Sequence, residues 1–328
     1  TTLFRSIDAQ NVYTFTRLEE VDRLKSNLDQ YESIAVIGGG FIGVEVAEQL
    51  AGLNKKIHII EAMSDVLSGP FDKEVTTEIQ SALEGLNVGV HVDQMANKIK
   101  IENGLAVGVE TSKATIKADA VIVSIGFRPN TAFLSGQLET LKNGAIVIDA
   151  YGQTSIENVF AAGDCATVPH RFAKDKYIPL ATYANKLGRL IGTNIVNDKK
   201  DWLKFEGALG SGFVKVGPYE AGVTGLTEKE ALDLKFNIKT TTVFTNNHSN
   251  YYPNQDKIMI KLIYDAETFV LYGAQVYGKE GAALRLHALT TAVFAGLTTQ
   301  EIGFIDYAYA PPFTSTWEAI NIAANTAK

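Results

Sequence analysis

The alternation of apolar and polar residues divides the chain into a first part with buried-strand and helix patterns and a last part with period-two strands. A short apolar run at residues 34–37 is typical of a buried parallel strand, and three glycines follow it directly. The next residues place apolar side chains on one helical face, and residues 56–60 supply a second apolar run. This order predicts a strand, a helix and a parallel strand, which is one βαβ unit.

Related patterns predict the other elements of the first part. A helix with Thr16 as N-cap and Glu19 completing a capping box precedes the βαβ unit. A second helix is expected at residues 72–86. Parallel strands are expected on either side of an antiparallel meander, at residues 88–92 and 120–125. The meander has three short alternating runs, with Asn103-Gly104 as its first turn: residues 99–102, 106–111 and 115–117.

The middle of the chain predicts one further strand and one long helix. A buried strand is expected to bring Gly163 and Asp164 to its carboxyl end, where open α/β sheets bind ligands. Residues 181–195 predict a helix. Its expected apolar face consists of Ala184, Leu187, Gly188, Ile191 and Ile195. From residue 207 the pattern predicts an α+β domain, with strands at 211–216, 239–244, 257–264 and 269–277 and helices from 281 and 317.

Composition narrows the class of protein. A chain of 328 residues is too long for one compact core, so two or three domains are expected. The net charge of −7 argues against nucleic acid or an anionic membrane surface as partner, and no apolar run approaches the ~20 residues of a membrane span. Cys165 is the only cysteine, which predicts a reducing, cytoplasmic setting. The five histidines lie far apart in sequence, so a metal site has little support.

The run from Gly38 to Gly43 is a G-x-G-x-x-G turn between a strand and a helix. Gly38 permits the tight turn, Gly40 lets backbone N–H groups approach a pyrophosphate, and Gly43 lets the helix pack against the strand. Glu61 closes the second strand, where a carboxylate accepts the ribose hydroxyls and repels a 2′-phosphate. This context favours NADH binding over a glycine-rich turn without a ligand, and NADH over NADPH.

Several motifs in order resemble the flavin-dependent pyridine nucleotide-disulfide oxidoreductases, in the branch of coenzyme A-disulfide reductase, NADH oxidase and NADH peroxidase. The run T-x-x-x-x-V-F-A-x-G-D that ends at Asp164 resembles the flavin signature. Residues 126–131 resemble a second nicotinamide-side motif, and residues 180–182 resemble the helix start beneath the flavin. The resemblance implies FAD and NADH as cofactors. The cofactor-binding residues that it implies are Gly38, Gly40, Phe41, Ile42, Gly43, Glu61, Gly126, Gly163, Asp164, Leu180, Ala181 and Thr182.

The resemblance also implies an α/β fold class, with a Rossmann-like NAD-binding domain inserted in the remainder of an FAD-binding domain and an α+β dimerisation domain after it. The expected limits are 1–30 for a remnant of the FAD-binding domain, 31–126 for the NAD(H)-binding domain, 127–205 for the C-terminal part of the FAD-binding domain, and 206–328 for the dimerisation domain. Residues 1–6 match the translated end of a sequencing adapter and are expected to be non-native. The family's redox cysteine and FAD fingerprint would precede this chain, so the chain is expected to be a fragment with little activity of its own.

For Tyr251, Tyr309 and Phe41 a functional role and a purely structural role are both open. In this family, tyrosines at the places of Tyr251 and Tyr309 reach across the homodimer, where a phenol can hydrogen-bond or protonate a leaving thiolate. The alternative is a pair of interface tyrosines. Phe41 resembles the aromatic that covers the flavin until nicotinamide displaces it, and the alternative is simple packing. Cys165 is expected to be structural, since nothing nearby in sequence marks a site that stabilises a thiolate.

The implied function is transfer of hydride from NADH to FAD and then of electrons to a disulfide such as coenzyme A disulfide or a persulfide. One alternative is an NADH oxidase or NADH peroxidase, with oxygen or peroxide as acceptor. A second alternative is a non-catalytic module that binds NAD and dimerises. In each case the C-terminal domain is expected to form a homodimer, with no nucleic acid or membrane partner.

Overall fold

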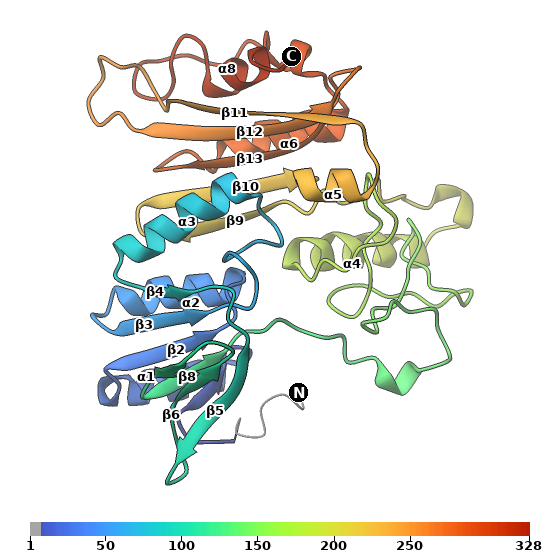
Figure 1. Ribbon diagram of the computed structural model, residues 1–328. Helices are drawn as coiled ribbons and strands as arrows, with labels where there is room; N and C mark the ends of the chain where they lie inside the picture. The colour runs from blue at the N-terminus through green and yellow to red at the C-terminus, as the bar shows by residue number, and fades with distance from the viewer. Residues whose placement is uncertain (1–7) are drawn as a thin grey trace.

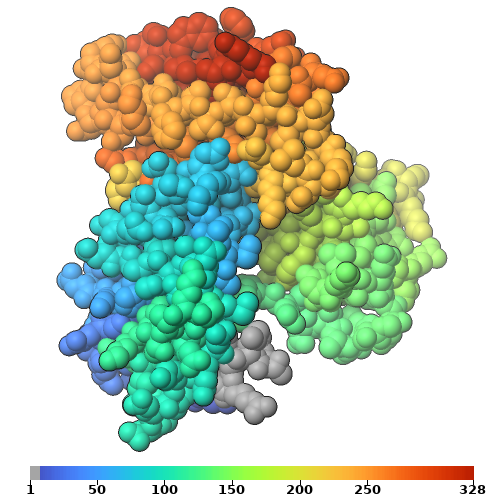
Figure 2. Space-filling view, viewed as in Figure 1, coloured from blue at the N-terminus to red at the C-terminus, as the bar shows by residue number. Residues whose placement is uncertain are grey.

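The computed structural model describes residues 8–328, so the segment expected to be non-native, residues 1–6, lies outside the described residues. The described residues form a five-stranded parallel sheet, a five-stranded antiparallel sheet and a three-stranded sheet. Figure 1 shows the parallel sheet at the lower left, the antiparallel sheet at the top and helix α4 at the right. Figure 2 shows the parallel-sheet part and the α4 part as separate masses below the antiparallel-sheet part.

The parallel sheet contains the predicted βαβ unit, which is confirmed. Its core is β2 (Ser33–Ile37), α2 (Phe41–Ala51) and β3 (Lys56–Ile60). The strand order is β1-β8-β2-β3-β4, with every pairing parallel. The remaining strands and helix are β1 (Val12–Thr14), α3 (Lys73–Gly85), β4 (Gly89–His91) and β8 (Ala120–Val123). Only β1, which has three residues, was absent from the sequence prediction.

Both faces of the parallel sheet are covered, which is why its strands are apolar at consecutive positions. Ile34, Ala35 and Val36 are fully buried. Val36 packs with residues of α2 and α3 on one face. Ala35 packs on the other face against the predicted meander, which is confirmed. The meander strands are β5 (Ala96–Glu102), β6 (Leu105–Thr111) and β7 (Thr115–Lys117).

The predicted capping box of the first helix is wrong. Helix α1 (Leu18–Asn27) begins after Arg17, and no side chain caps it. The chain turns immediately after β1, where the Thr16 N–H donates to the Thr14 carbonyl at 2.8 Å, so Thr16 belongs to that turn. Glu20 takes the stabilising role instead, because its carboxylate accepts from the Thr14 N–H at 3.4 Å and from Arg23 at 2.8 Å.

The antiparallel sheet has the order β11-β12-β13-β10-β9 and carries helices on its faces, so the predicted fold class is confirmed. Its strands are β9 (Gly212–Val216), β10 (Tyr219–Gly225), β11 (Ile238–Asn246), β12 (Lys257–Asp265) and β13 (Leu271–Gly278). Its helices are α5 (Glu228–Asp233), α6 (Arg285–Ala295), α7 (Thr299–Ile302) and α8 (Ala319–Asn325). The sequence prediction missed β10, whose glycines weaken a strand pattern. Gly222 has a packing reason, because an added Cβ would lie 2.8 Å from the Phe213 ring.

Around helix α4 the structure differs from the sequence prediction in two respects. Helix α4 (Ala181–Ile195) has its predicted bounds, but Ile195 is 60% exposed and Gly188 is also exposed, while Tyr183 and Leu190 are buried instead. The predicted strand before Gly163 does not form among the described residues. Residues 155–159 are exposed and fold back in a turn, and the segment makes only isolated bridges, between Gln153 and Phe160 and between Ile146 and Ala166.

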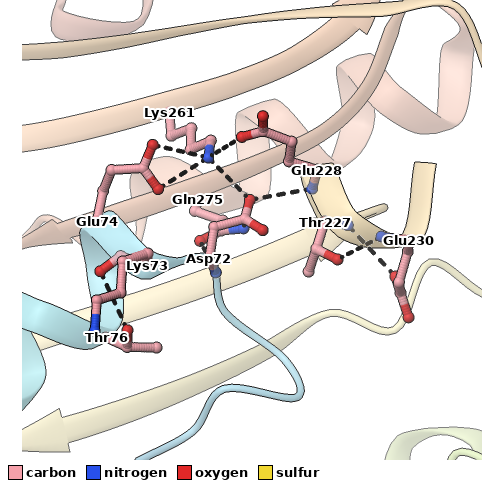
Figure 3. A network of polar contacts seen from close by, with 9 residues as sticks. All are labelled: Asp72, Lys73, Glu74, Thr76, Thr227, Glu228, Glu230, Lys261 and Gln275. Atoms are coloured by element: carbon pink, nitrogen blue, oxygen red, sulfur yellow. Dashed lines mark hydrogen bonds and ion pairs between the residues drawn. The ribbon is translucent and has the colours of Figure 1, made fainter. Parts of the chain in front are cut away.

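A buried lysine joins α3 to the antiparallel sheet (Figure 3). The ammonium of Lys261 on β12 is 1% exposed and lies 3.3 Å from Asp72, 2.9 Å from Glu74 and 2.6 Å from Glu228. Burial raises the pKa of Asp72, although the Glu228 N–H and the Lys261 ammonium act against that rise. Burial alone would lower the pKa of Lys261, but hydrogen bonds to Glu228 and Glu74 and the charge of Asp72 raise it overall. The cluster therefore fixes the N-terminus of α3 against β12.

Candidate active site

The glycine turn before α2 is shaped by close contacts. Gly38 has φ of +105°, and an added Cβ would lie 2.4 Å from the Ser124 carbonyl oxygen. At Gly43 an added Cβ would lie 1.9 Å from the Gly38 carbonyl oxygen, so α2 can approach the strand only with glycine there. Gly40 differs, because apart from its chain neighbours no atom of residues 8–328 lies within 4 Å of its Cβ position. The open space is therefore on the side where a ligand would approach.

The N-terminus of α2 opens into that space. Gly40 is the N-cap, and no side chain caps the helix. An α-helix leaves its first N–H groups without intrahelical partners, and its dipole favours negative charge there. The N–H groups at Phe41 and Ile42, in the first turn, thus fit a pyrophosphate.

Glu61 is held beside the same turn. Its Oε2 accepts the Gly39 N–H at 2.7 Å, and its Oε1 accepts the Met63 N–H at 2.8 Å. These two bonds fix the carboxylate at the carboxyl end of β3, where it can receive ribose hydroxyls. The glycine turn and Glu61 together fit NADH.

A cavity of about 720 Å³ lies where α2, α4 and α6 meet. Phe41 lines it from the glycine turn, and Leu180, Ala181 and Thr182 line it from the start of α4. The Phe41 ring is half-buried and also packs edge-on against Phe71, with 6.1 Å between ring centroids. Both interpretations of Phe41 therefore remain open.

The start of α4 suits a group that gains negative charge. Leu180 is the N-cap, no side chain caps the helix, and Ala181 and Thr182 are exposed. The positive end of the helix dipole therefore faces the cavity. Thr290 also lines the cavity, but its Oγ1 is itself buried and has no hydrogen-bond partner among the described residues. These features fit the pyrimidine side of a flavin, which carries negative charge when reduced.

Gly163, Asp164 and Gly126 lie outside the residues that line the cavity. Gly163 has φ of +82° and lies beside α4, with 3.7 Å from an added Cβ to the Ala184 Cβ. Asp164 is exposed, and among the described residues only its carbonyl is bonded, by the Tyr177 hydroxyl at 3.1 Å. Gly126 has φ of +83° in the exposed, irregular segment after β8. The Asp164 carboxylate is free to accept hydroxyls of a ligand beside α4.

Tyr251 and Tyr309 meet although 58 positions separate them in sequence: their hydroxyl oxygens lie 2.8 Å apart. The side chains are 70% and 44% exposed. The hydrogen bond between them raises the pKa of Tyr251 and lowers the pKa of Tyr309, as expected when Tyr251 donates and Tyr309 accepts. Neither tyrosine lines the cavity of the same chain.

Glu45 was missed by the sequence prediction. It lies one helical turn after Phe41 on α2 and lines the same cavity. Partial burial raises the pKa of Glu45, although the residue as a whole is exposed. The i, i+4 spacing from Phe41 was the available signal.

Cys165 follows Asp164 but differs from it in environment. The thiol is partly buried, donates to the Ala162 carbonyl at 3.4 Å and packs in the small core beside α4. Its structural role stays a prediction. No helix in the described part of the chain is long and apolar enough to span a membrane.

An open glycine turn, a carboxylate at the next strand end and a second uncapped helix facing the same cavity define a nicotinamide-dependent flavin oxidoreductase. Residues 4–188 match the family model of pyridine nucleotide-disulphide oxidoreductases, and residues 213–320 match the model of their dimerisation domain. The chain belongs to the pyridine nucleotide-disulphide oxidoreductase family, whose members use FAD and NAD(P)H, so the expected resemblance is confirmed.

Named relatives divide between two activities. The chain is 34% identical over 327 residues to the NAD(P)H coenzyme A polysulfide/persulfide reductase of Pyrococcus horikoshii. The alignment covers 98% of this chain and 72% of the relative. It is 29% identical over 326 residues to an NADH oxidase of Enterococcus faecalis, with the same coverage of 98% and 72%. The solved structure of an NAD-dependent persulfide reductase from A. fulgidus matches with a TM-score of 0.93 at 30% identity, covering 99% of this chain and 60% of that one.

Proposed function

We propose that the protein oxidises NADH and reduces a disulfide such as coenzyme A disulfide or a related persulfide. The balanced reaction consumes one NADH, one proton and one disulfide and yields NAD⁺ and two thiols. FAD, when bound, accepts the hydride and passes two electrons onward. The observation that carries the choice of acceptor is the contact between the Tyr251 and Tyr309 hydroxyls.

The tyrosine pair suits a leaving thiolate. A thiol has an ordinary pKa near ~8.5 and a phenol near ~10, so an unperturbed tyrosine hydrogen-bonds a thiolate better than it protonates one. The lowered pKa of Tyr309 narrows this gap. With its hydroxyl 2.8 Å away, Tyr251 can donate to Tyr309 and would stabilise the phenolate that forms when the proton leaves.

The other residues have binding and orienting roles in this proposal. The N–H groups at the start of α2 hold the NADH pyrophosphate, and Glu61 receives its ribose. The start of α4, with Leu180, Ala181 and Thr182, stabilises negative charge on the flavin, and Asp164 receives its ribityl hydroxyls. A homodimer would bring the tyrosine pair of one subunit to the cavity of its partner.

One observation favours a second candidate, an NADH oxidase, because the Enterococcus faecalis relative carries that name. An oxidase has no thiolate to protonate, so it leaves the tyrosine pair without a catalytic role. A non-catalytic module that binds NAD and dimerises stays a further alternative. The cavity between Phe41 and the uncapped start of α4 argues against this module, since binding NAD alone does not require it.

The test compares electron acceptors for the protein purified from its natural source with its flavin. NADH oxidation is followed with coenzyme A disulfide, with oxygen and with hydrogen peroxide at equal concentrations. We expect the disulfide to give the highest turnover. Faster turnover with oxygen or peroxide would contradict the reductase and support an oxidase or a peroxidase. A protein that binds NADH but holds no flavin would support the non-catalytic module.

The domain limits and the location in the cell are also proposals. The limits 1–30, 31–126, 127–205 and 206–328 are our proposed domain limits. A cytoplasmic location rests on the cysteine content, because Cys165 has no second cysteine in this sequence with which to form a disulfide.

A further inference from the structure

The two tyrosines depend on their loops for alignment. Tyr251 lies in the loop between β11 and β12, and Tyr309 lies in the segment between α7 and α8. Within the single chain the two side chains are 70% and 44% exposed, so packing fixes the phenols only in part. The distance between the hydroxyls therefore follows from how the two loops are held relative to one another.

Arg285, in the first turn of α6, contacts both loops with one guanidinium. Its Nη2 donates to the carbonyl of Asn247, at the base of the Tyr251 loop, and at 3.1 Å to the carbonyl of Phe313, in the Tyr309 segment. Its Nη1 donates to the Gly281 carbonyl at 3.1 Å, and its Nε pairs with the Glu318 carboxylate. The Arg285 side chain is only 13% exposed and that of Glu318 only 9%, so the ion pair is largely shielded from water, whereas the bond to the Phe313 carbonyl is exposed.

The loops have a second, weaker tie and an internal brace. The buried Ser249 hydroxyl donates to the Thr314 carbonyl at 3.2 Å, which links the two loops directly. The Tyr251 loop is closed at its base, where the Asn247 N–H donates to the Asp256 carbonyl at 2.9 Å. Arg285 therefore contacts the Tyr251 loop at its hydrogen-bonded base.

We propose that Arg285 is the positioning residue of the tyrosine pair: its guanidinium sets the Tyr251 loop against the Tyr309 segment so that the two hydroxyls meet. A guanidinium suits this task because its planar fork directs several donors at once, whereas a lysine ammonium lacks that fixed geometry. Glu318 balances the charge and, as the N-cap of α8, anchors the far end of the Tyr309 segment. The catalytic consequence rests on the proposed function, but the positioning does not.

The test measures the proximity of the phenols separately from turnover. Photo-oxidation with tris(bipyridyl)ruthenium and persulfate removes one electron and one proton from each of two adjacent phenols, which then join by a carbon–carbon bond. Peptide mapping of the single-chain product quantifies the link between Tyr251 and Tyr309. The variants are Arg285→Lys and Arg285→Met, with Tyr251→Phe as the blank.

We expect both Arg285 variants to reduce the Tyr251–Tyr309 link by about tenfold, and disulfide turnover to fall on the order of tenfold to a hundredfold through kcat rather than the KM for NADH. If Arg285→Met folds poorly, Arg285→Lys still decides the matter. Lys261→Met is the matched control, because it also removes a buried cation but lies at the α3 junction. It should leave the link unchanged.

The outcomes separate the two proposals. An unchanged link in folded Arg285→Lys and Arg285→Met overturns the positioning role. A reduced link with undiminished disulfide turnover supports the positioning role and contradicts the catalytic role of the tyrosines.

Discussion

At the scale of the residue, we propose that Glu61 sets how the nucleotide site distinguishes NADH from NADPH. Its carboxylate is fixed by the Gly39 and Met63 N–H groups, so it cannot turn away from a 2′-phosphate. Glu61→Gln removes the charge while keeping the size of the side chain. We expect the KM for NADH to rise about tenfold, because hydrogen bonds to a charged group are worth about 1.5–3 kcal/mol, and the preference over NADPH to narrow.

Steady-state kinetics with each nucleotide would check this. Glu84→Gln, on the exposed side of α3, is the control and should change neither constant. An unchanged ratio of NADH to NADPH efficiency in Glu61→Gln would contradict the assigned role.

His170 gives a prediction about pH. Burial, with a smaller contribution from Lys176, lowers the pKa of His170 to about 4, and its Nδ1 accepts the N–H groups of Phe172 and Ala173 at 3.3 and 3.2 Å. The unfolded chain binds a proton below about pH 6.5 and the folded chain only near pH 4. The contribution of neutral His170 is therefore full above pH 6.5 and is lost as the pH falls toward 4, up to about 3 kcal/mol.

Urea unfolding at pH 7 and at pH 4.5 would measure this loss. His170→Asn keeps an acceptor but does not titrate, so its free energy of unfolding should fall less over this range than that of the parent. His287→Asn, at an exposed position, is the control. Equal losses in His170→Asn and the parent would refute the assignment.

Residues with a local signature could be predicted from the sequence, and residues defined by distant contacts could not. The Gly38–Gly43 run and Glu61 are recognisable because strand, turn and helix are contiguous. Arg285 shows no such signal, since its partners Asn247 and Phe313 lie 38 and 28 positions away. The spacing of residues along the sequence cannot reveal a contact that only the tertiary fold creates.

At the scale of the element, the Lys261 cluster links α3 to the antiparallel sheet. Lys261→Met would leave Asp72, whose side chain is 9% exposed, without its counter-charge, whereas Glu74 and Glu228 are about 40% exposed and can turn to water. We expect a loss near the lower end of the 3–5 kcal/mol typical of a broken buried pair, about 3 kcal/mol.

The free energy of unfolding in urea would measure it. Lys199→Met is the matched control, because the Lys199–Glu157 pair is 62% and 70% exposed and should contribute less than about 1 kcal/mol. Adding Asp72→Asn to Lys261→Met should recover part of the loss. Equal effects of Lys261→Met and Lys199→Met would show that the cluster does not stabilise the junction.

Element prediction failed where tertiary partners decide the backbone. The strand expected before Gly163 has an apolar run at residues 159–162, but residues 155–159 turn back on themselves and the run makes only an isolated bridge, at Phe160, among the described residues. Thr16 and Glu19 have the pattern of a capping box, yet the turn after β1 takes Thr16. A local pattern cannot indicate which of two competing hydrogen bonds the fold will select.

At the scale of the whole molecule, the glycine turn and the start of α4 meet at one cavity, while the tyrosine pair lies away from it in the same chain. The family models match residues 4–188 and then 213–320, which is the predicted order of the oxidoreductase part and the dimerisation domain. The place of the tyrosines relative to the cavity was expected only through the family resemblance, and we propose that it involves a second subunit. The central claim is therefore that the tyrosine pair serves a disulfide acceptor.

The most direct test is the double variant Tyr251→Phe/Tyr309→Phe of the flavin-loaded protein, assayed with NADH and either coenzyme A disulfide or oxygen. We predict that disulfide turnover falls about a hundredfold, because proton donation to the leaving thiolate is lost, while oxygen turnover and the KM for NADH stay unchanged. Undiminished disulfide turnover, or an equal fall with both acceptors, would contradict the account.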